Sequence, residues 1–291
     1  MLKIKAILIS LRPNNWIKNG FLFAPLIFAG KLLQREYFAE EILAFIAFCL
    51  CSSATYLIND IIDFQADTLH PVKSQRPIAK GLLSKRIGLL MSIVIFISSL
   101  VISLFVHKWL FIILITYYFL NLLYSLYLKK CVIVDVMTIA FDFELRIWAG
   151  SVVIGVVPSV WLQMTTFLLA LFLGFAKRRQ EIFMLGQIAQ GHRLVLSNYQ
   201  VSLLDQFITL CGGLSILAYA LYTVSPEVSS RTGTGYLIYT LPFVIYGIFR
   251  YLYIVWGGKE SSDPVESLLS DIPLLMSVIL WGFAIFLILY R

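Results

Sequence analysis

The sequence predicts an all-α protein of the polytopic membrane class, a bundle of about nine transmembrane helices. Of its 291 residues, 60% are hydrophobic and only 13% are charged, against roughly 45–50% and about 25% in soluble domains. A water-soluble fold could not hide that much apolar surface, so lipid must cover most of it. A membrane β-barrel would alternate polar and apolar residues over ~10-residue segments, and stretches such as Ile87–Val106 do not alternate.

The helices are expected wherever a long apolar run lies between polar breaks. A spanning helix needs ~20 mainly apolar residues, and tight breaks alternate with longer ones along this chain. Residues 1–17 are interrupted by Arg12-Pro13 and predict an amphipathic lead-in, not a cleavable signal. The longer polar breaks are 63–86, 129–133, 177–198 and 257–270. The nine expected spans are 20–34, 40–62, 87–106, 109–128, 134–156, 159–178, 199–223, 235–256 and 271–290.

The basic residues predict which way the bundle is inserted. With the N-terminus in the cytosol, 16 of the 23 Lys and Arg residues fall on the inner face. The positive-inside rule therefore predicts a cytosolic N-terminus and an outer C-terminus, for a single membrane domain over 1–291. A basic rim on an anionic leaflet explains the net charge of +7 without nucleic acid. Because only the inner face has long loops, we expect a site open to the cytosol and not a transport pathway.

The acidic end of the second expected span is the most informative stretch. Asn59, Asp63 and Asp67 follow one another at intervals of four, and Asp60 lies three before Asp63. On a helix of 3.6 residues per turn these oxygen-bearing side chains share one face. Oxygen ligands without histidine or cysteine suit magnesium, which binds carboxylates together with substrate phosphates. The alternative is a solvated helix end, which like-charge repulsion and adjacent hydrocarbon both disfavour.

A basic turn follows the acidic motif at once. The sequence His70-Pro71-Val72-Lys73-Ser74-Gln75-Arg76-Pro77 ends the helix and predicts a rigid cytosolic turn. Lys73 and Arg76 would then face back towards the acids. Arginine contacts phosphate oxygens in pairs and lysine supplies a mobile point charge. Acids that hold a divalent metal, followed by such a turn, predict a diphosphate site; ordinary positive-inside charge is the alternative for these two residues.

Further charged residues gather at other inner helix ends and within the fifth span. Ionisable side chains at membrane depth are functional candidates, with a buried ion pair as the structural alternative. The basic run after the sixth span is equally consistent with side chains that reach for the interface. These residues are Tyr124, Lys129, Lys130, Asp135, Asp142, Glu144, Arg146, Lys177, Arg178, Arg179, Asp263, Glu266 and Asp271.

These motifs resemble the UbiA superfamily of intramembrane prenyltransferases. The signature Asn-Asp-x-x-Asp-x-x-x-Asp is present in full from Asn59 to Asp67. The chain is most similar to the polyprenyl-phosphate phosphoribosyltransferase branch, of which decaprenyl-phosphate phosphoribosyltransferase is the type. The motifs similar to that branch are Leu11-Arg12-Pro13, Trp16-Ile17-Lys18-Asn19, His70-Pro71-x-Lys73-x-x-Arg76-Pro77, Tyr124-Ser125, Asp135-Val136, Phe143-x-Leu145-Arg146-x-x-Ala149-Gly150, Lys177-Arg178-Arg179 and Pro264-x-Glu266 with Asp271.

The resemblance implies a magnesium-dependent transfer of 5-phosphoribose from phosphoribosyl diphosphate to a membrane polyprenyl phosphate, for cell-envelope glycan synthesis. It also implies a bacterial inner-membrane protein whose site faces the cytosol. The metal ligands would be Asn59, Asp60, Asp63 and Asp67, and the catalytic residues Asp60, Asp63, Asp67, Lys73 and Arg76. The substrate-binding residues would be Lys18, Asn19, Lys73, Arg76, Tyr124, Lys129, Asp135, Arg146, Lys177 and Arg178.

Two departures from the family pattern bear on the reaction. In the family that this chain resembles, members with aromatic acceptors carry a second motif, Asp-x-x-x-Asp. Here Asp135 could begin such a motif, but the residue four positions later is Ile139 and not an aspartate. This difference disfavours a quinone-type enzyme, while the aspartate at Asp142 is unusual for the branch and has no assigned role. The alternatives are a UbiA-type enzyme that transfers the prenyl group to an aromatic precursor, and a transporter or lipid-binding scaffold.

Overall fold

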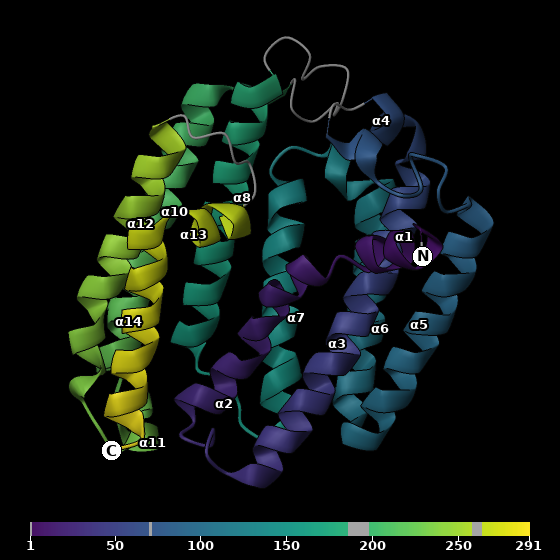
Figure 1. Ribbon diagram of the computed structural model, residues 1–291. Coiled ribbons are helices and arrows are strands. Elements are labelled where there is room, and N and C mark those ends of the chain that lie inside the picture. Colours follow the sequence, from purple (N-terminus) through teal and green to yellow (C-terminus); the bar gives the residue numbers. More distant parts are fainter. Residues whose placement is uncertain (1, 70–71, 186–197, 258–263) are drawn as a thin grey trace. The chain divides into compact units, whose positions relative to one another are not determined.

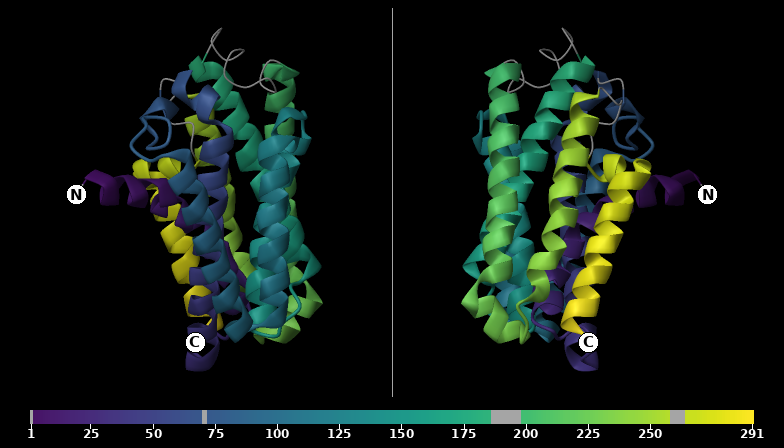
Figure 2. Two further views of the ribbon diagram at one scale, coloured as in Figure 1. Left: turned by 90° about the vertical axis from the view of Figure 1, so that its right-hand side faces the viewer. Right: turned by 90° about the vertical axis from the view of Figure 1, so that its left-hand side faces the viewer.

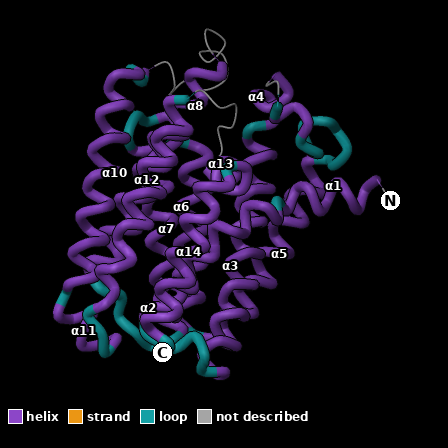
Figure 3. The backbone as a smooth tube through the Cα atoms, turned by 60° about the vertical axis from the view of Figure 1, so that its left-hand side comes forward, coloured by secondary structure: helices purple, strands orange, loops and turns teal. Residues whose placement is uncertain are grey.

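The computed structural model describes residues 2–69, 72–185, 198–257 and 264–291 (Figure 1). Every regular element in these ranges is helical, as Figure 3 shows, which confirms the expected all-α class. The helices are α1 (Leu2–Leu11), η1 (Pro13–Phe23), α2 (Ala24–Phe28), α3 (Arg35–Ile62), α4 (Phe64–Leu69), η2 (Lys73–Gln75), α5 (Lys85–Val106), α6 (Lys108–Leu126), η3 (Leu128–Lys130), α7 (Val134–Val153), α8 (Val160–Leu185), α10 (Val201–Val224), α11 (Pro226–Thr232), η6 (Tyr236–Thr240), α12 (Leu241–Trp256), α13 (Pro264–Ser270) and α14 (Ile272–Leu289).

Seven described helices are long and apolar enough to cross a membrane. They are α3, α5, α6, α8, α10, the continuous stretch of η6 and α12, and α14. Each corresponds to one of the nine expected spans. Of the two other expected spans, 134–156 is helix α7, which is not among the seven because it contains four charged residues, Asp135, Asp142, Glu144 and Arg146. The total of nine spans and the orientation of the termini stay predictions.

The first expected span, 20–34, is not one helix, and here the prediction was wrong. The 3₁₀ helix η1 begins at Pro13, whose fixed φ and missing N–H suit a first helical position. The short α2 then ends at Phe28, and the chain turns at Gly30 with a φ of 70°. Glycine is the residue that adopts this left-handed conformation at little cost, so the turn separates α2 from α3.

The expected loops contain more helix than the sequence predicted. Segment 63–86 contains α4 and η2, and segment 257–270 contains α13. Helix α8 continues beyond the expected end at 178, and α11 lies between two expected spans. Residues 70–71, 186–197 and 258–263, which include His70, Pro71 and Asp263 of the predicted motifs, lie outside the described residues.

The chain divides into two compact units. The first comprises Met1–Leu26, Gln34–Thr138 and Leu145–Val156, and the second comprises Ile27–Leu33, Ile139–Glu144 and Val157–Arg291. The four predicted metal ligands and the basic turn all belong to the first unit. Lys177 and Arg178 belong to the second. The expectation of one membrane domain over the whole chain stays a prediction.

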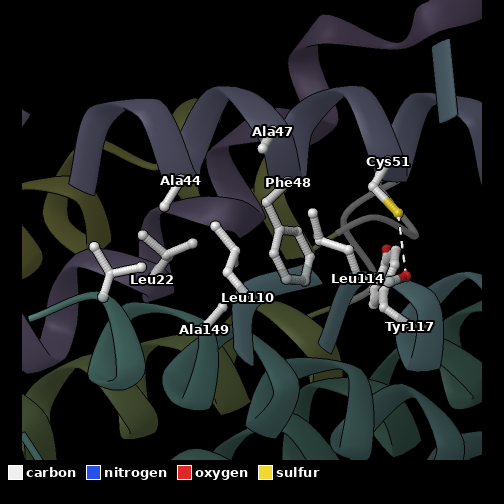
Figure 4. Packing of buried hydrophobic residues seen from close by; sticks show 10 residues of the cluster. Leu22, Ala44, Ala47, Phe48, Cys51, Leu110, Leu114, Tyr117 and Ala149 are labelled. Carbon is white, nitrogen blue, oxygen red and sulfur yellow. Dashed lines mark hydrogen bonds between the residues drawn. The ribbon is translucent and has the colours of Figure 1, made fainter. Parts of the chain in front are cut away.

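The first unit is built on the packing of α3 against α5 and α6. In Figure 4, Phe48 of α3 points towards Leu110 and Leu114 of α6, and Cys51 Sγ contacts the Leu114 carbonyl oxygen at 3.6 Å. On the other side, Ser92 and Ser99 of α5 are buried and donate hydrogen bonds to α3 carbonyl groups at 2.9 and 2.8 Å. Small residues allow helices in lipid to approach closely. Helix α1 runs crosswise to these long helices (Figure 2).

The second unit is held by buried polar contacts among its apolar helices. Tyr290, directly after α14, donates its hydroxyl to the Ile27 carbonyl at 2.9 Å and accepts from the Leu32 amide at 3.1 Å. These bonds fasten segment 27–33 to the end of α14. Asp271 caps α14 and also accepts two hydrogen bonds from Arg250, each 3.0 Å long. Asp271, which the family motif contains, therefore has a structural partner within this unit.

Candidate active site

The predicted metal ligands lie where α3 gives way to α4. Helix α3 ends at Ile62, and Asp63 has a non-helical φ and ψ of −84° and 5°. Helix α3 therefore ends inside the motif, at the expected end of the second span. The helical hydrogen bonds nevertheless continue: the Asp63 amide donates to the Asn59 carbonyl and the Asp67 amide to the Asp63 carbonyl, both at 2.8 Å. Because these bonds preserve the four-residue spacing, the motif stays together across the break.

Each carboxylate of the motif is paired with a cation. Arg76 Nη1 lies 3.1 Å from Asp60 Oδ1 and 2.6 Å from Asp67 Oδ2. Lys129 Nζ contacts Asp63 Oδ1. Asp60 and Asp67 are buried, and Asp63 is the most exposed of the three, with 25% of its side chain accessible. Three acids beside hydrocarbon need such compensation, because buried unpaired charge is costly.

The basic turn faces the acids, as the sequence predicted for Arg76. The 3₁₀ helix η2 begins at Lys73, and the Arg76 amide donates to the Lys73 carbonyl at 2.9 Å. This hydrogen bond closes the turn and directs Arg76 onto two carboxylates that are seven residues apart. Lys73 is half-buried in the same turn. The turn therefore brings at least one of its two expected phosphate-binding cations to the acidic motif.

Arg12 is a site residue that the sequence reading did not assign. It lies between α1 and η1 with φ 52° and ψ 58°, a left-handed conformation that costs roughly 1–2 kcal/mol in a residue with a Cβ. Its guanidinium contacts Asp60 Oδ1 and lies 4.9 Å from the centre of the Tyr56 ring. Burial lowers the pKa of Arg12, and the charge of Asp60 opposes that effect. The only signal in the sequence was its place in the Leu11-Arg12-Pro13 motif.

Contacts with α3 hold the turn at Arg12 in place. Ser53 Oγ lies 2.9 Å from the Leu11 carbonyl oxygen and accepts a hydrogen bond from Trp16 Nε1 at 3.0 Å. Ser53, Tyr56 and Asp60 follow one another at intervals of three and four on α3, so they share one face of the helix. This face binds the backbone before Arg12 and the side chain of Arg12 together. Arg12 is therefore fixed on Asp60 by local structure as well as by charge.

Asn59 contacts a different helix from the acids. Its Oδ1 accepts a hydrogen bond from Ser125 Oγ of α6 at 3.0 Å. Tyr124, the adjacent residue, is half-buried on α6, and Lys129 follows at η3. The Tyr124-Ser125 motif therefore lies beside the acidic motif through Ser125. Lys129 contacts Asp63, and its expected role in substrate binding stays a prediction.

Asn19 and Arg146 form a separate buried cluster. Arg146 Nε donates to Asn19 Oδ1 at 2.9 Å, and its Nη2 donates to the Tyr117 hydroxyl at 3.1 Å. The Asn19 amide in turn lies 3.2 Å from Ser52 Oγ on α3. Ser52 precedes Asp60 by eight residues, or about 12 Å along a helix. The two residues contact each other and lie deeper than the acids, so their expected role in substrate binding stays a prediction.

The remaining predicted binding residues are Lys18, Asp135, Lys177 and Arg178. Lys18 is half-buried on η1, and Asp135 is fully buried at the start of α7. Lys177 and Arg178 belong to the second unit, where Arg178 is buried and pairs with Glu181 at 2.8 Å. Their expected binding roles stay predictions.

The acidic motif has the donor chemistry that magnesium requires. Among the described residues, no three His, Cys, Asp or Glu side chains converge to hold a metal ion, because the carboxylates point at cations instead. Yet Asp60 and Asp67 both contact a single nitrogen of Arg76. A small cation in place of that nitrogen would touch both carboxylates. With Asp63 and the carbonyl oxygen of Asn59 close by in sequence, the residues fit an oxygen-coordinated divalent metal.

Comparison with known proteins identifies the family. Residues 23–270 match the model of the UbiA prenyltransferase family. Decaprenyl-phosphate phosphoribosyltransferase of Mycolicibacterium smegmatis is 29% identical over 289 residues, which cover 96% of this chain and 90% of that protein. The protein of the same name from Corynebacterium glutamicum is 30% identical over 289 residues, covering 97% and 86%.

The fold agrees with this match. A solved UbiA homologue of Archaeoglobus fulgidus, bound to GPP and Mg²⁺, aligns with a TM-score of 0.71 at 17% identity, covering 98% of this chain and all of that one. The likeness at this identity concerns the fold alone. The chain belongs to the UbiA prenyltransferase family. It is an integral membrane protein and a transferase of that family.

Proposed function

We propose that this protein transfers 5-phosphoribose from phosphoribosyl diphosphate to a long-chain polyprenyl phosphate, with release of diphosphate. The observation that carries the proposal is the group of three carboxylates and three cations at the end of α3. Such a group can bind a metal and the phosphates of two charged substrates. The names of the two relatives, which match this chain over nearly its whole length, support the same reaction.

Magnesium is the proposed cofactor, held by Asn59, Asp60, Asp63 and Asp67. When bound, it would stabilise the negative charge that develops on the diphosphate leaving group. Magnesium dependence is also supported by the Mg²⁺ in the solved structure of a family member.

The chain's own cations bind and orient the substrates. Arg76 and Lys73 lie on one turn at the acidic motif, where they would hold phosphate oxygens of the donor. Lys129, beside Asp63, adds a third positive charge on the side of α6. The attacking lipid phosphate is already an anion, so the reaction needs no strong general base, and attack on the anomeric carbon would invert its configuration. We propose that this end of the bundle faces the cytosol, where the donor is soluble.

A transfer assay with paired substrates tests this proposal. Membranes that contain the protein would be incubated with Mg²⁺ and labelled phosphoribosyl diphosphate plus decaprenyl phosphate, or with labelled prenyl diphosphate plus an aromatic acid. We expect a lipid-linked phosphoribose from the first pair only, and at least ~10-fold less of it with the Asp63→Asn variant. Prenylation of the aromatic acid without any lipid-linked sugar would instead assign prenyl transfer. Equal lipid-linked product from the variant would rule out the acidic motif as the site.

A further inference from the structure

The three carboxylates of the acidic motif are all paired with cationic side chains of the same chain. Asp60 is contacted by both Arg12 and Arg76, Asp67 by Arg76, and Asp63 by Lys129. Three carboxylates thus face three cations. Two of the contacts are to Asp60, which is almost fully buried with 2% of its side chain exposed. Both arginines contact Oδ1 of Asp60, so a metal ion cannot bind that oxygen without displacing them.

A bare magnesium ion would meet an unfavourable balance at this motif. It would add positive charge to a set of groups that is already paired, and it would leave the displaced guanidinium groups without acceptors in a partly buried place. A magnesium diphosphate carries net negative charge and brings oxygen acceptors with it. Arginine forms its strongest contacts with such oxygens. When the metal takes the carboxylates and the arginines take phosphate oxygens, every charged group keeps a partner of opposite charge and the arginines keep their hydrogen bonds.

We propose that Arg12 and Arg76 occupy the carboxylates in the resting protein and move to the diphosphate when metal and diphosphate bind together. Arg12 is accordingly a third phosphate-binding residue of the donor site, beside Lys73 and Arg76. The inference rests on the proposed function only in requiring a diphosphate substrate, whether its organic part is a sugar or a prenyl group.

The backbone at Arg12 suits this exchange. The residue is held in a left-handed conformation between α1 and η1, and Ser53 anchors the backbone just before it. The side chain can therefore change its partner from carboxylate to phosphate while its backbone stays fixed. The Tyr56 ring lies 4.9 Å from the guanidinium and attracts its positive charge. This attraction can persist while the side chain moves a short distance from carboxylate to phosphate. Arg76, at the end of a closed turn, is anchored in a similar way.

Metal-binding measurements on the purified full-length protein test the exchange. Mn²⁺ binding would be followed by electron paramagnetic resonance in detergent, with and without inorganic diphosphate, and corrected for Mn²⁺–diphosphate complexes by a protein-free titration. We expect the unchanged protein to bind Mn²⁺ at least tenfold more tightly when diphosphate is present. Arg12→Gln should bind Mn²⁺ alone more tightly than the unchanged protein, and labelled diphosphate more weakly. Arg12→Lys, which keeps the charge, should lie between the two.

Lys85→Gln is the matched control for removing a nearby positive charge. Lys85 lies 3.8 Å from the centre of the Phe64 ring, beside the motif but on an aromatic partner. Its loss should leave Mn²⁺ binding nearly unchanged. Equal effects of Lys85→Gln and Arg12→Gln, or equal Mn²⁺ affinity of the unchanged protein and Arg12→Gln, would overturn the exchange. Because no organic substrate is used, failure of the phosphoribosyl assay would leave these outcomes unaffected.

Discussion

Replacing Gly150 by alanine should destabilise the first unit by more than a typical glycine substitution. An added Cβ at Gly150 of α7 would lie 2.0 Å from the Leu22 carbonyl oxygen and 2.6 Å from Glu41 Oε1. Ordinary van der Waals contact begins at 3.4 Å, so α7 and η1 must separate by roughly 1.4 Å, the difference between 3.4 and 2.0 Å. Overpacking typically costs about 1–3 kcal/mol. The Leu22 carbonyl belongs to the backbone and cannot rotate away as a side chain can, so we expect a cost near ~3 kcal/mol.

Thermal unfolding in detergent would measure this loss. With an unfolding entropy of about 2.1 cal/mol/K per residue, a loss of about 3 kcal/mol lowers the melting temperature of a chain of this size by roughly 5 °C. Arg146, one turn earlier on α7, should also lose its 2.9 Å contact with Asn19. Gly213→Ala on α10 is the matched control, because a Cβ there meets nothing within 4 Å. Equal melting temperatures for the two variants would refute the close approach of α7 to η1.

Three further outcomes follow from the site and from the second unit. Asp63→Asn removes a proposed metal ligand and the partner of Lys129. Transfer should fall at least ~10-fold, because a hydrogen bond to a charged group contributes about 1.5–3 kcal/mol. Unchanged turnover of the variant in membranes would contradict the role of Asp63. Chelation with EDTA should abolish transfer and added Mg²⁺ should restore it, whereas full activity in EDTA would exclude the metal. Tyr290→Phe removes the hydrogen bonds to Ile27 and Leu32, each worth about 1 kcal/mol. The melting temperature should fall by roughly 2–4 °C. An unaltered melting curve would show that these bonds contribute nothing to stability.

The sequence was sufficient for the helical class and most spans because lipid imposes a simple rule on length and composition. The same rule was insufficient at residues 20–34. There, Pro13 and Gly30 set the helix ends through backbone geometry, and an apolar run alone did not reveal a 3₁₀ helix that begins before it. Helix α7 shows that the rule tolerates charge: 134–156 was expected as a span despite its four charged residues, and Val134–Val153 is a helix of 20 residues.

At the site, the residues close in sequence were the ones that could be predicted. Asp60, Asp67 and Arg76 lie within one short stretch, and helical spacing followed by a proline-bounded turn was enough to bring them together. Arg12 contacts Asp60 across 48 residues of sequence. That contact depends on how α1 and η1 pack against α3, which spacing does not encode. Asn19 and Arg146 contact each other across 127 residues of sequence, and spacing along the chain did not predict that pairing either.

The most direct test of the proposed metal-diphosphate site is an experimental structure of the protein with Mg²⁺ and phosphoribosyl diphosphate. We expect a metal ion on the carboxylates of Asp60 and Asp67, with the diphosphate on its far side. Arg76 and Arg12 should have left these carboxylates for phosphate oxygens. A structure in which the diphosphate is bound elsewhere, with Arg76 still between Asp60 and Asp67, would contradict the assignment of this motif as the donor site.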